Sequence, residues 1–178
     1  NRYSGRTFIM GDQETRESAL RLKINLIRSE FEGQRVVVID DSIVRGTTIR
    51  RLLDLIWSQG PRAVHFAIHS PPVLHPCYYG IDMSTESELV ARTFVPGGPR
   101  EAGGALDPES QKSLEESWAQ DLGVDSLTFL STESLDSAFP GSRCAACFDG
   151  VYPLAVPEDQ RLSIVQDRSC RPAATPRS

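Results

Sequence analysis

The sequence is short of positive charge and of long apolar runs, and each shortage excludes a class of protein. Its 178 residues carry 19 lysines and arginines against 24 aspartates and glutamates, a formal net charge of -5. A broad surface for nucleic acid needs clustered basic residues. No apolar run approaches the roughly 20 residues of a membrane span, and no basic start leads into an apolar segment of the signal-peptide kind. We therefore expect a cytoplasmic protein that binds neither nucleic acid nor membrane.

Cysteine is also sparse. The chain has only four, at Cys77, Cys144, Cys147 and Cys170. In a cytoplasmic protein, thiols this few are metal ligands or free thiols more often than a disulfide framework. The C-A-A-C spacing of Cys144 and Cys147 allows two thiolates to bind one metal ion, and a lone pair of this kind favours zinc or a redox dithiol.

The hydrophobic pattern of the first half predicts alternating helices and strands. Apolar residues at helical spacing predict a helix over 13–27 and another from Thr47 to a stop at Gly60. The apolar run Val36–Ile39 predicts a fully buried strand, and segment 63–72 a second one. A strand, a short loop, a helix and a strand form a βαβ unit. Its right-handed crossover places the first loop at the carboxyl edge of a parallel sheet.

The second half is less regular. A capping box from Thr85 to Glu88 predicts the start of another helix. A stretch rich in glycine and proline follows, which predicts a flexible surface loop. Asp107 is a suitable N-cap for a helix on which Leu114, Trp118 and Leu122 share one face. A short strand over 124–131 and a short helix over 132–139 come next, and we expect the tail after Pro153 to be frayed.

Two adjacent carboxylates, Asp40 and Asp41, end the first strand in "VVVIDDSIVRGTT". A loop that leads into a helix N-terminus can hold a phosphate through its backbone N–H groups without net positive charge. Gly46 permits close backbone approach, and the hydroxyl donors are Ser42, Thr47 and Thr48. The carboxylates can accept hydrogen bonds from sugar hydroxyls or hold a hydrated Mg²⁺. The plainer alternative is that Asp41 caps the helix and Asp40 ends the strand.

This stretch resembles the phosphoribosyl pyrophosphate (PRPP) signature of type I phosphoribosyltransferases. Further segments narrow the resemblance: "NRYSGRTFI", "RLKIN", "HSPPVLHPCYYGIDMSTESELVA", "LGVDSLTFLS" and "CAACFDGVYP". Their order and spacing are similar to those of glutamine PRPP amidotransferases, over about residues 1–153 apart from the glycine-rich loop. The resemblance implies an α/β fold of the type I phosphoribosyltransferase kind. It is Rossmann-like, with a parallel sheet and flanking helices, is incomplete, and is followed by a small α+β C-terminal region.

The resemblance also implies a function. Members of this family are glycosyltransferases of the pentosyltransferase class. They convert PRPP, glutamine and water to 5-phosphoribosylamine, pyrophosphate and glutamate, the first committed step of de novo purine (IMP) biosynthesis. Small molecules are the expected partners: PRPP, glutamine-derived ammonia and purine nucleotides as feedback inhibitors. The full-length protein is expected to be a homotetramer.

By the same resemblance, the site residues fall into four groups. Asp40 and Asp41 contact the ribose and Mg²⁺. The loop around the 5′-phosphate consists of Ser42, Ile43, Val44, Arg45, Gly46, Thr47 and Thr48. Tyr3 and Arg6 belong to a mobile loop that closes over PRPP and keeps water out. Arg21 and Lys23 neutralise the pyrophosphate leaving group, or else lie on the solvated face of a helix.

The resemblance assigns the cysteines as well. In the branch of the family that carries a [4Fe–4S] cluster, ligands lie at the positions of Cys77, Cys144 and Cys147, and the fourth ligand lies upstream of this chain. Cys77 thereby shifts the interpretation of the cysteine pair from zinc to iron–sulfur. We expect His75 to be packed or solvent-facing and Cys170 to be a free thiol.

The expected organisation has four parts. Residues 1–92 form the C-terminal half of a phosphoribosyltransferase domain, 93–109 a Gly/Pro-rich insertion, 110–153 the cluster-binding region and 154–178 a frayed tail. The start at Asn1 suggests a sequence entered in mid-domain, and the glutaminase domain with its N-terminal cysteine is absent. We thus expect a fragment that is inactive alone. The alternatives are a non-catalytic PRPP-binding regulatory or vestigial module and a free-base phosphoribosyltransferase, although no hood for a base is recognisable.

Overall fold

A computed structural model describes residues 26–81, 85–98, 104–141 and 143–169. Several predictions from the sequence lie outside these residues. They concern most of the helix over 13–27 and the residues Tyr3, Arg6, Arg21, Lys23 and Cys170. The end of the expected helix can be examined, because Leu26 and Ile27 are described, and neither is helical. A short 3₁₀ turn, η2 (Arg28–Glu30), follows them.

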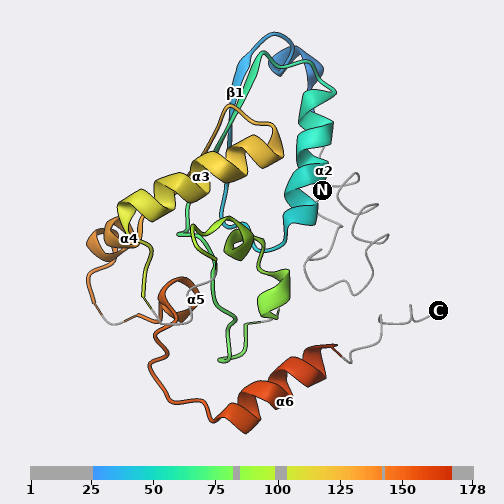
Figure 1. Cartoon of the computed structure of the whole chain (residues 1–178). Helices are drawn as coiled ribbons and strands as arrows, with labels where there is room; N and C mark the ends of the chain where they lie inside the picture. Colours follow the sequence, from blue (N-terminus) through green and yellow to red (C-terminus); the bar gives the residue numbers. More distant parts are fainter. Residues whose placement is uncertain (1–25, 82–84, 99–103, 142, 170–178) are drawn as a thin grey trace, which may run out of the picture.

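Strands and helices alternate along the chain (Figure 1). The strands are β1 (Arg35–Asp40), β2 (Ala63–Ile68) and β3 (Ser126–Phe129). The longer helices are α2 (Gly46–Trp57), α3 (Pro108–Leu122) and α6 (Glu158–Ser169). The shorter ones are α4 (Thr132–Ala138), α5 (Ala146–Asp149), η3 (Glu86–Glu88) and η4 (Val90–Phe94).

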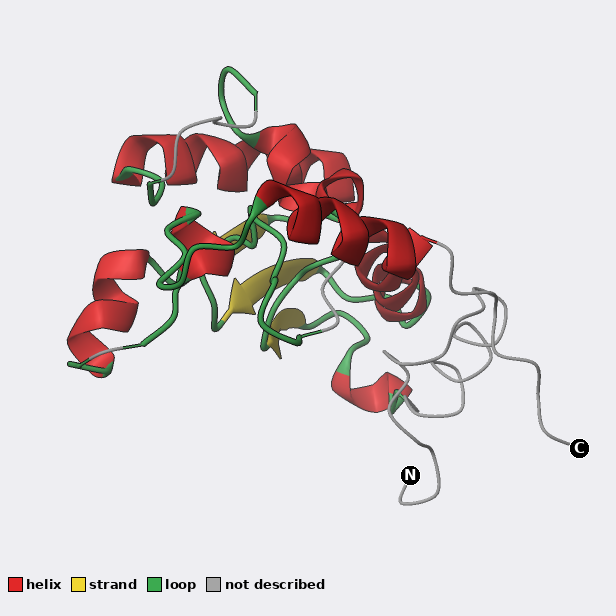
Figure 2. Ribbon diagram, turned by 90° about the horizontal axis from the view of Figure 1, so that it is seen from below, coloured by secondary structure: helices red, strands yellow, loops and turns green. Residues whose placement is uncertain are grey.

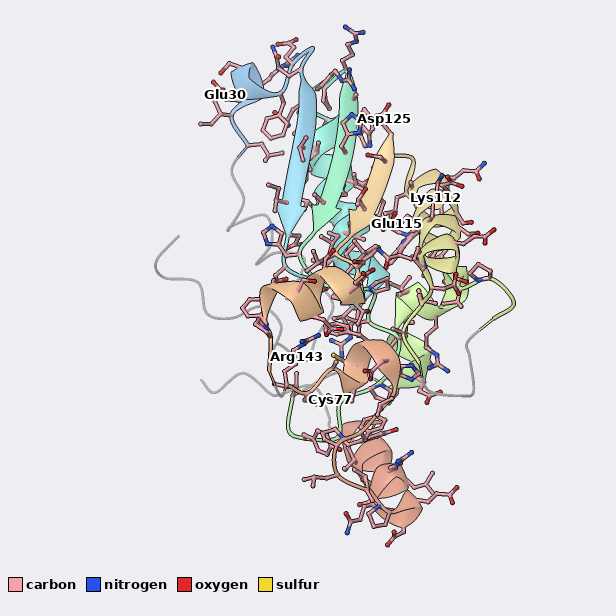
Figure 3. The ribbon with its side chains drawn as sticks, turned by 90° about the vertical axis from the view of Figure 1, so that its left-hand side faces the viewer. Glu30, Cys77, Lys112, Glu115, Asp125 and Arg143 are labelled. Atoms are coloured by element: carbon pink, nitrogen blue, oxygen red, sulfur yellow. The ribbon has the colours of Figure 1, made fainter. Side chains whose placement is uncertain are left out.

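The strands form one parallel sheet in the order β1-β2-β3. Val36 pairs with Val64 and Val38 with Phe66, and Phe66 pairs in turn with Leu127. The predicted strand–loop–helix–strand unit is therefore confirmed. All carboxyl ends lie at the same edge, toward which the arrowheads point in Figure 3.

A single hydrophobic core covers one face of this sheet. Ile49, Leu53 and Ile56 of α2 and Leu114 and Trp118 of α3 pack against the alternate residues of the strands that point toward them. Because β3 and α3 belong to the same sheet and core as β1 and α2, the expected C-terminal region is continuous with the first part. Figure 2 shows the strands with these helices around them.

The first strand is buried on one face only, so the prediction of a fully buried strand was wrong. Val36 and Val38 are half-buried, whereas Val37 and Ile39 are 60% and 62% exposed. The apolar run has no alternation from which the two faces could be told apart. Helix α2 packs on the side of Val38.

The capping box predicted at Thr85 is not formed. The Thr85 hydroxyl lies 3.0 Å from the Ser87 hydroxyl, and two short 3₁₀ helices, η3 and η4, replace the expected α-helix. Leu89 between them has an extended backbone and is 1% exposed. The N–H of Val90 donates to the carbonyl of Val44 at 3.2 Å, a bond that an α-helix would not allow.

Helix α3 begins as predicted. The Asp107 carboxylate accepts hydrogen bonds from the N–H and the hydroxyl of Ser110, at 2.9 and 2.7 Å. Trp118 stacks between Phe94 and Phe129, with ring centroids 5.1 and 5.5 Å apart. Phe94 and the buried Val95 thus belong to the core, although the sequence placed both in the insertion 93–109.

The tail after Pro153 contains a helix, so the prediction that it is frayed was wrong for residues 158–169. Helix α6 starts just after Pro157. The carboxylates of Glu158 and Asp159 in its first turn stabilise it, because they lie at the positive end of the helix dipole. In Figure 1 it lies below the sheet and next to the chain that leaves α5. Among the described residues, no helix is long and apolar enough to span a membrane.

Candidate functional site

The carboxyl edge of the sheet brings together the ends of all strands. The N–H of His69 donates to the carbonyl of Asp40 at 3.0 Å, and the N–H of Leu130 donates to that of Ile68 at the same distance. The strand tips are therefore held side by side. Asp40 and Asp41 lie at this edge, at the position predicted from the sequence.

The two carboxylates are exposed and are held by short-range contacts. Asp40 Oδ1 accepts the N–H of Asp41 at 2.9 Å, and Asp41 Oδ1 accepts the Ser42 hydroxyl at 3.3 Å. Partial shielding from water raises the pKa of Asp40, and the neighbouring Asp41 carboxylate adds to this rise. The hydrogen bond from Asp41 and the nearby His69 act in the opposite direction. Asp41 does not cap α2, because the N-cap residue is Arg45.

The loop from Ser42 to Arg45 is anchored to the core and to the segment of Val90. Ile43 is 4% exposed and belongs to the core, so its side chain cannot face a ligand and only its backbone can. The carbonyl of Val44 accepts the N–H of Val90. A side chain at Gly46 would come within 3.1 Å of Val90 Cγ2, so glycine allows this close packing.

The N-terminus of α2 opens toward the same edge. No side chain caps it. Thr47 and Thr48 lie in the first turn and are exposed. The first N–H groups of a helix have no partner within the helix, and together with the dipole they favour an anion. The strand tip and the start of α2 thus bring together carboxylates, hydroxyls and backbone N–H groups that have no partner within the helix.

The segments that carry Cys77 and Cys147 lie side by side. The N–H groups of Leu74 and His75 both donate to the carbonyl of Cys147, at 2.9 and 3.0 Å. The Tyr152 hydroxyl donates to the carbonyl of Pro76 at 2.7 Å. These bonds bring two regions that are distant in sequence to one place, with Cys144 just before α5.

The three thiols interact electrostatically. Burial raises the pKa of Cys147 to about 11, and the neighbouring Cys144 and Cys77 contribute to the rise. Such a thiol is a poor nucleophile at neutral pH, which disfavours a redox dithiol. Within the described parts of the chain, no three cysteine, histidine, aspartate or glutamate side chains are arranged to hold a metal ion. Three cysteine thiols are donors that suit an iron–sulfur cluster, but their side chains do not point toward one common position in this structure.

His75 is half-buried and packs against Gly150, whose φ is +72°. A Cβ at Gly150 would lie 2.9 Å from His75 Cε1. We expect Gly150→Ala to lower the free energy of unfolding by about 2–4 kcal/mol, since left-handed backbone and crowding both cost energy. Gly60→Ala is the matched control, because Gly60 has φ +77° and nothing near its Cβ position. Urea unfolding would measure both, and equal losses would contradict the packing.

Sequence reasoning missed two arginines near these segments. Arg92 donates to the carbonyl of Leu74 at 2.8 Å and pairs with Glu86 at 2.9 Å. Arg161 of α6 lies over the rings of Tyr78 and Tyr152. Both contacts join residues far apart in the sequence. The consecutive tyrosines after Cys77 were the only local signal, and they do not identify their partner.

Comparisons with known proteins agree with this geometry. Residues 6–70 match the family model described as the phosphoribosyl transferase domain. An amidophosphoribosyltransferase of Methanothermobacter thermautotrophicus is 48% identical over 89% of this chain and 30% of its own length. That of Bacillus subtilis is 42% identical over 94% of this chain and 33% of its own length. The chain therefore spans about a third of these relatives.

Solved structures give the same result. Glutamine PRPP amidotransferase from B. subtilis, in complex with ADP and GMP, matches with a TM-score of 0.61 and 41% identity over 89% of this chain and 32% of its own. A structure described as the allosteric regulatory enzyme of purine biosynthesis matches with a TM-score of 0.59 and 37% identity, over 90% of this chain and 32% of its own. The expected fold, an incomplete phosphoribosyltransferase-type sheet with flanking helices, is confirmed.

Proposed function

Since the chain is homologous to amidophosphoribosyltransferases over about nine tenths of its own length, we propose that it supplies the PRPP-binding part of such an enzyme. The observation that carries this proposal is the strand tip, where Asp40 and Asp41 precede an anchored loop and an uncapped helix N-terminus. Glutamine hydrolysis is not assigned to these residues, because the chain aligns with only about a third of its relatives.

The site suits a sugar phosphate. Asp40 and Asp41 accept hydrogen bonds from the ribose hydroxyls and bind the Mg²⁺ that accompanies PRPP. The 5′-phosphate lies at the backbone amides of the loop and the first turn of α2, with hydroxyls from Ser42, Thr47 and Thr48. Ile43 and Val44 take part through their backbone, because the core and η4 hold them.

The reaction is a displacement at C1 of the ribose. The nitrogen of ammonia forms a bond to C1 as the bond from C1 to the pyrophosphate oxygen breaks. The nitrogen then loses one proton to pyrophosphate or water, which gives 5-phosphoribosylamine and pyrophosphate. In the full enzyme, Arg21 and Lys23 balance the charge of the leaving group, and Tyr3 and Arg6 close the site against water. Cytoplasmic location, a tetrameric assembly and feedback by purine nucleotides belong to the same proposal.

The cysteines form a second part of the proposal. Cys77, Cys144 and Cys147 supply three thiolates to a [4Fe–4S] cluster, and a residue outside this chain supplies the fourth ligand. The adjacency of the two cysteine segments supports this assignment. Bound iron would stabilise the thiolates.

We expect the full-length protein that contains this chain to release pyrophosphate from PRPP when ammonia or glutamine and Mg²⁺ are present, and not with a free purine or pyrimidine base. The assay measures pyrophosphate and phosphoribosylamine with each acceptor in turn. Turnover with a base would indicate a free-base transferase. Tight binding of PRPP without turnover, by a protein that includes the glutaminase domain, would indicate a regulatory module.

A further inference from the structure

One arginine joins helix α6 to a cluster of three tyrosines, Tyr78, Tyr79 and Tyr152. The rings of Tyr78 and Tyr152 have centroids 5.0 Å apart, and Tyr79 meets Tyr152 edge-on at 6.0 Å. The guanidinium carbon of Arg161 lies 5.4 Å from the Tyr78 centroid and 5.3 Å from that of Tyr152. Both distances fall within the range of attraction between a cation and an aromatic face.

The tyrosine cluster belongs to the two cysteine segments. Tyr78 and Tyr79 directly follow Cys77, and Tyr152 follows the segment of Cys147. Besides the bond from Tyr152 to Pro76, the Tyr79 hydroxyl donates to the carbonyl of Leu154 at 2.7 Å and accepts the Leu154 N–H at 3.0 Å. The N–H of Tyr79 also points at Cys77 Sγ, at 3.4 Å.

Among the α6 side chains that the structure describes, Arg161 contacts this cluster. It is half-buried, while residues 158–160 and 162–163 are exposed. Its Nε donates to the carbonyl of Val156 at 3.0 Å, and its backbone N–H donates to that of Pro157 at the same distance. The side chain is thus fixed near the start of the helix, with its guanidinium over two rings. Figure 3 shows Cys77 on the side of the body that α6 approaches.

We propose that Arg161 is a clasp that docks α6 on the tyrosine cluster and thereby holds the Cys77 loop against the Cys147 segment. Docking limits the access of solvent and oxidants to the half-buried thiols of Cys77 and Cys147. Cys144 is exposed and is not protected. The inference rests on the proposed cysteine site for its biological purpose, but the clasp itself does not depend on which metal binds there.

Thiol labelling tests the clasp. The full chain, reduced and freed of metal by chelation without oxygen, is treated with iodoacetamide, and mass spectrometry follows each cysteine. Arg161→Ala is expected to speed the labelling of Cys77 and Cys147 by roughly tenfold, because the variant lacks the cation–aromatic contacts with Tyr78 and Tyr152 and the local structure opens more often. The rate at exposed Cys144 should stay the same and serves as the internal reference.

Two variants make the result specific. Arg161→Lys keeps the charge but loses the planar stacking and the Nε bond, so an intermediate rate is expected. Gln160→Ala, on the exposed side of the same helix, should match the unaltered chain. Labelling of Cys77 and Cys147 within twofold of the unaltered chain in both Arg161 variants would overturn the clasp. So would faster labelling of all three thiols, because that reports general unfolding. Metal analysis of the untreated protein tests the cluster separately.

Discussion

Replacing Asp40 and Asp41 together with asparagine is expected to weaken PRPP binding in the presence of Mg²⁺ by at least about 100-fold. A hydrogen bond to a charged group contributes about 1.5–3 kcal/mol, and each 1.4 kcal/mol is a factor of ten in affinity. Losing two carboxylates therefore removes about 3–6 kcal/mol of binding free energy. Isothermal titration calorimetry with PRPP and Mg²⁺ measures the change directly.

The fold should tolerate this double substitution. The pKa of Asp40 is raised in the folded chain, so above that pKa its ionised form costs folding free energy, and a neutral asparagine relieves this cost. In the variant, Oδ1 of the asparagine at position 40 can still accept the hydrogen bond from the backbone N–H of residue 41. Asp54→Asn is the matched control, because Asp54 is exposed on α2 away from its N-terminus. Unchanged affinity of the double variant would mean that the two aspartates have only a structural role.

The strand–loop–helix unit could be predicted because its signals are local. An apolar run, two carboxylates, a loop with glycine and a helical repeat follow one another in the sequence, and the handedness of the crossover fixes where the loop lies. Asp107 before Pro108 was equally informative about α3. Each of these features depends on residues within a few positions of one another, and tertiary packing does not override them.

The predictions from sequence were wrong where contacts between residues far apart in the chain determine the local structure. The residues after Thr85 satisfy a capping box locally, but the bond from Val90 to Val44 and the burial of Leu89 favour an extended break. In the same way, Val36–Ile39 carries no sign of which face is covered. The resemblance to a known family only suggests ligand roles for the cysteines, whereas the folded chain shows that Leu74 and His75 bond to the backbone of Cys147.

Helix α6 is the clearest case. Its sequence has few apolar residues, and Leu162 remains 57% exposed, so hydrophobic periodicity gives little reason to expect a docked helix. Its contact with the body instead uses the Arg161 guanidinium and two aromatic rings. A charged side chain over tyrosines leaves no periodic pattern in the sequence. The contact can therefore be recognised only from the folded structure, in which the arginine and the tyrosines lie together.

Replacing Cys147 with serine is expected to abolish the bound iron. In full-length protein purified without oxygen, the unaltered form should hold roughly four irons per chain and show broad visible absorption, as a [4Fe–4S] cluster does. Cys147 is held through its carbonyl against the segment of Cys77, and its thiol interacts electrostatically with Cys144 and Cys77. Iron and sulfide analysis with the visible spectrum measures the loss.

Cys170→Ser is the control, since no ligand role is assigned to that thiol, and it should keep the full iron content. Because the Cys147 thiol is half-buried and its carbonyl bonds do not involve the side chain, serine should leave the backbone contacts of Leu74 and His75 intact. The free energy of unfolding of the metal-free variant should then match that of the metal-free unaltered chain. Zinc without iron in the unaltered protein would instead show that the three cysteines form part of a structural zinc site.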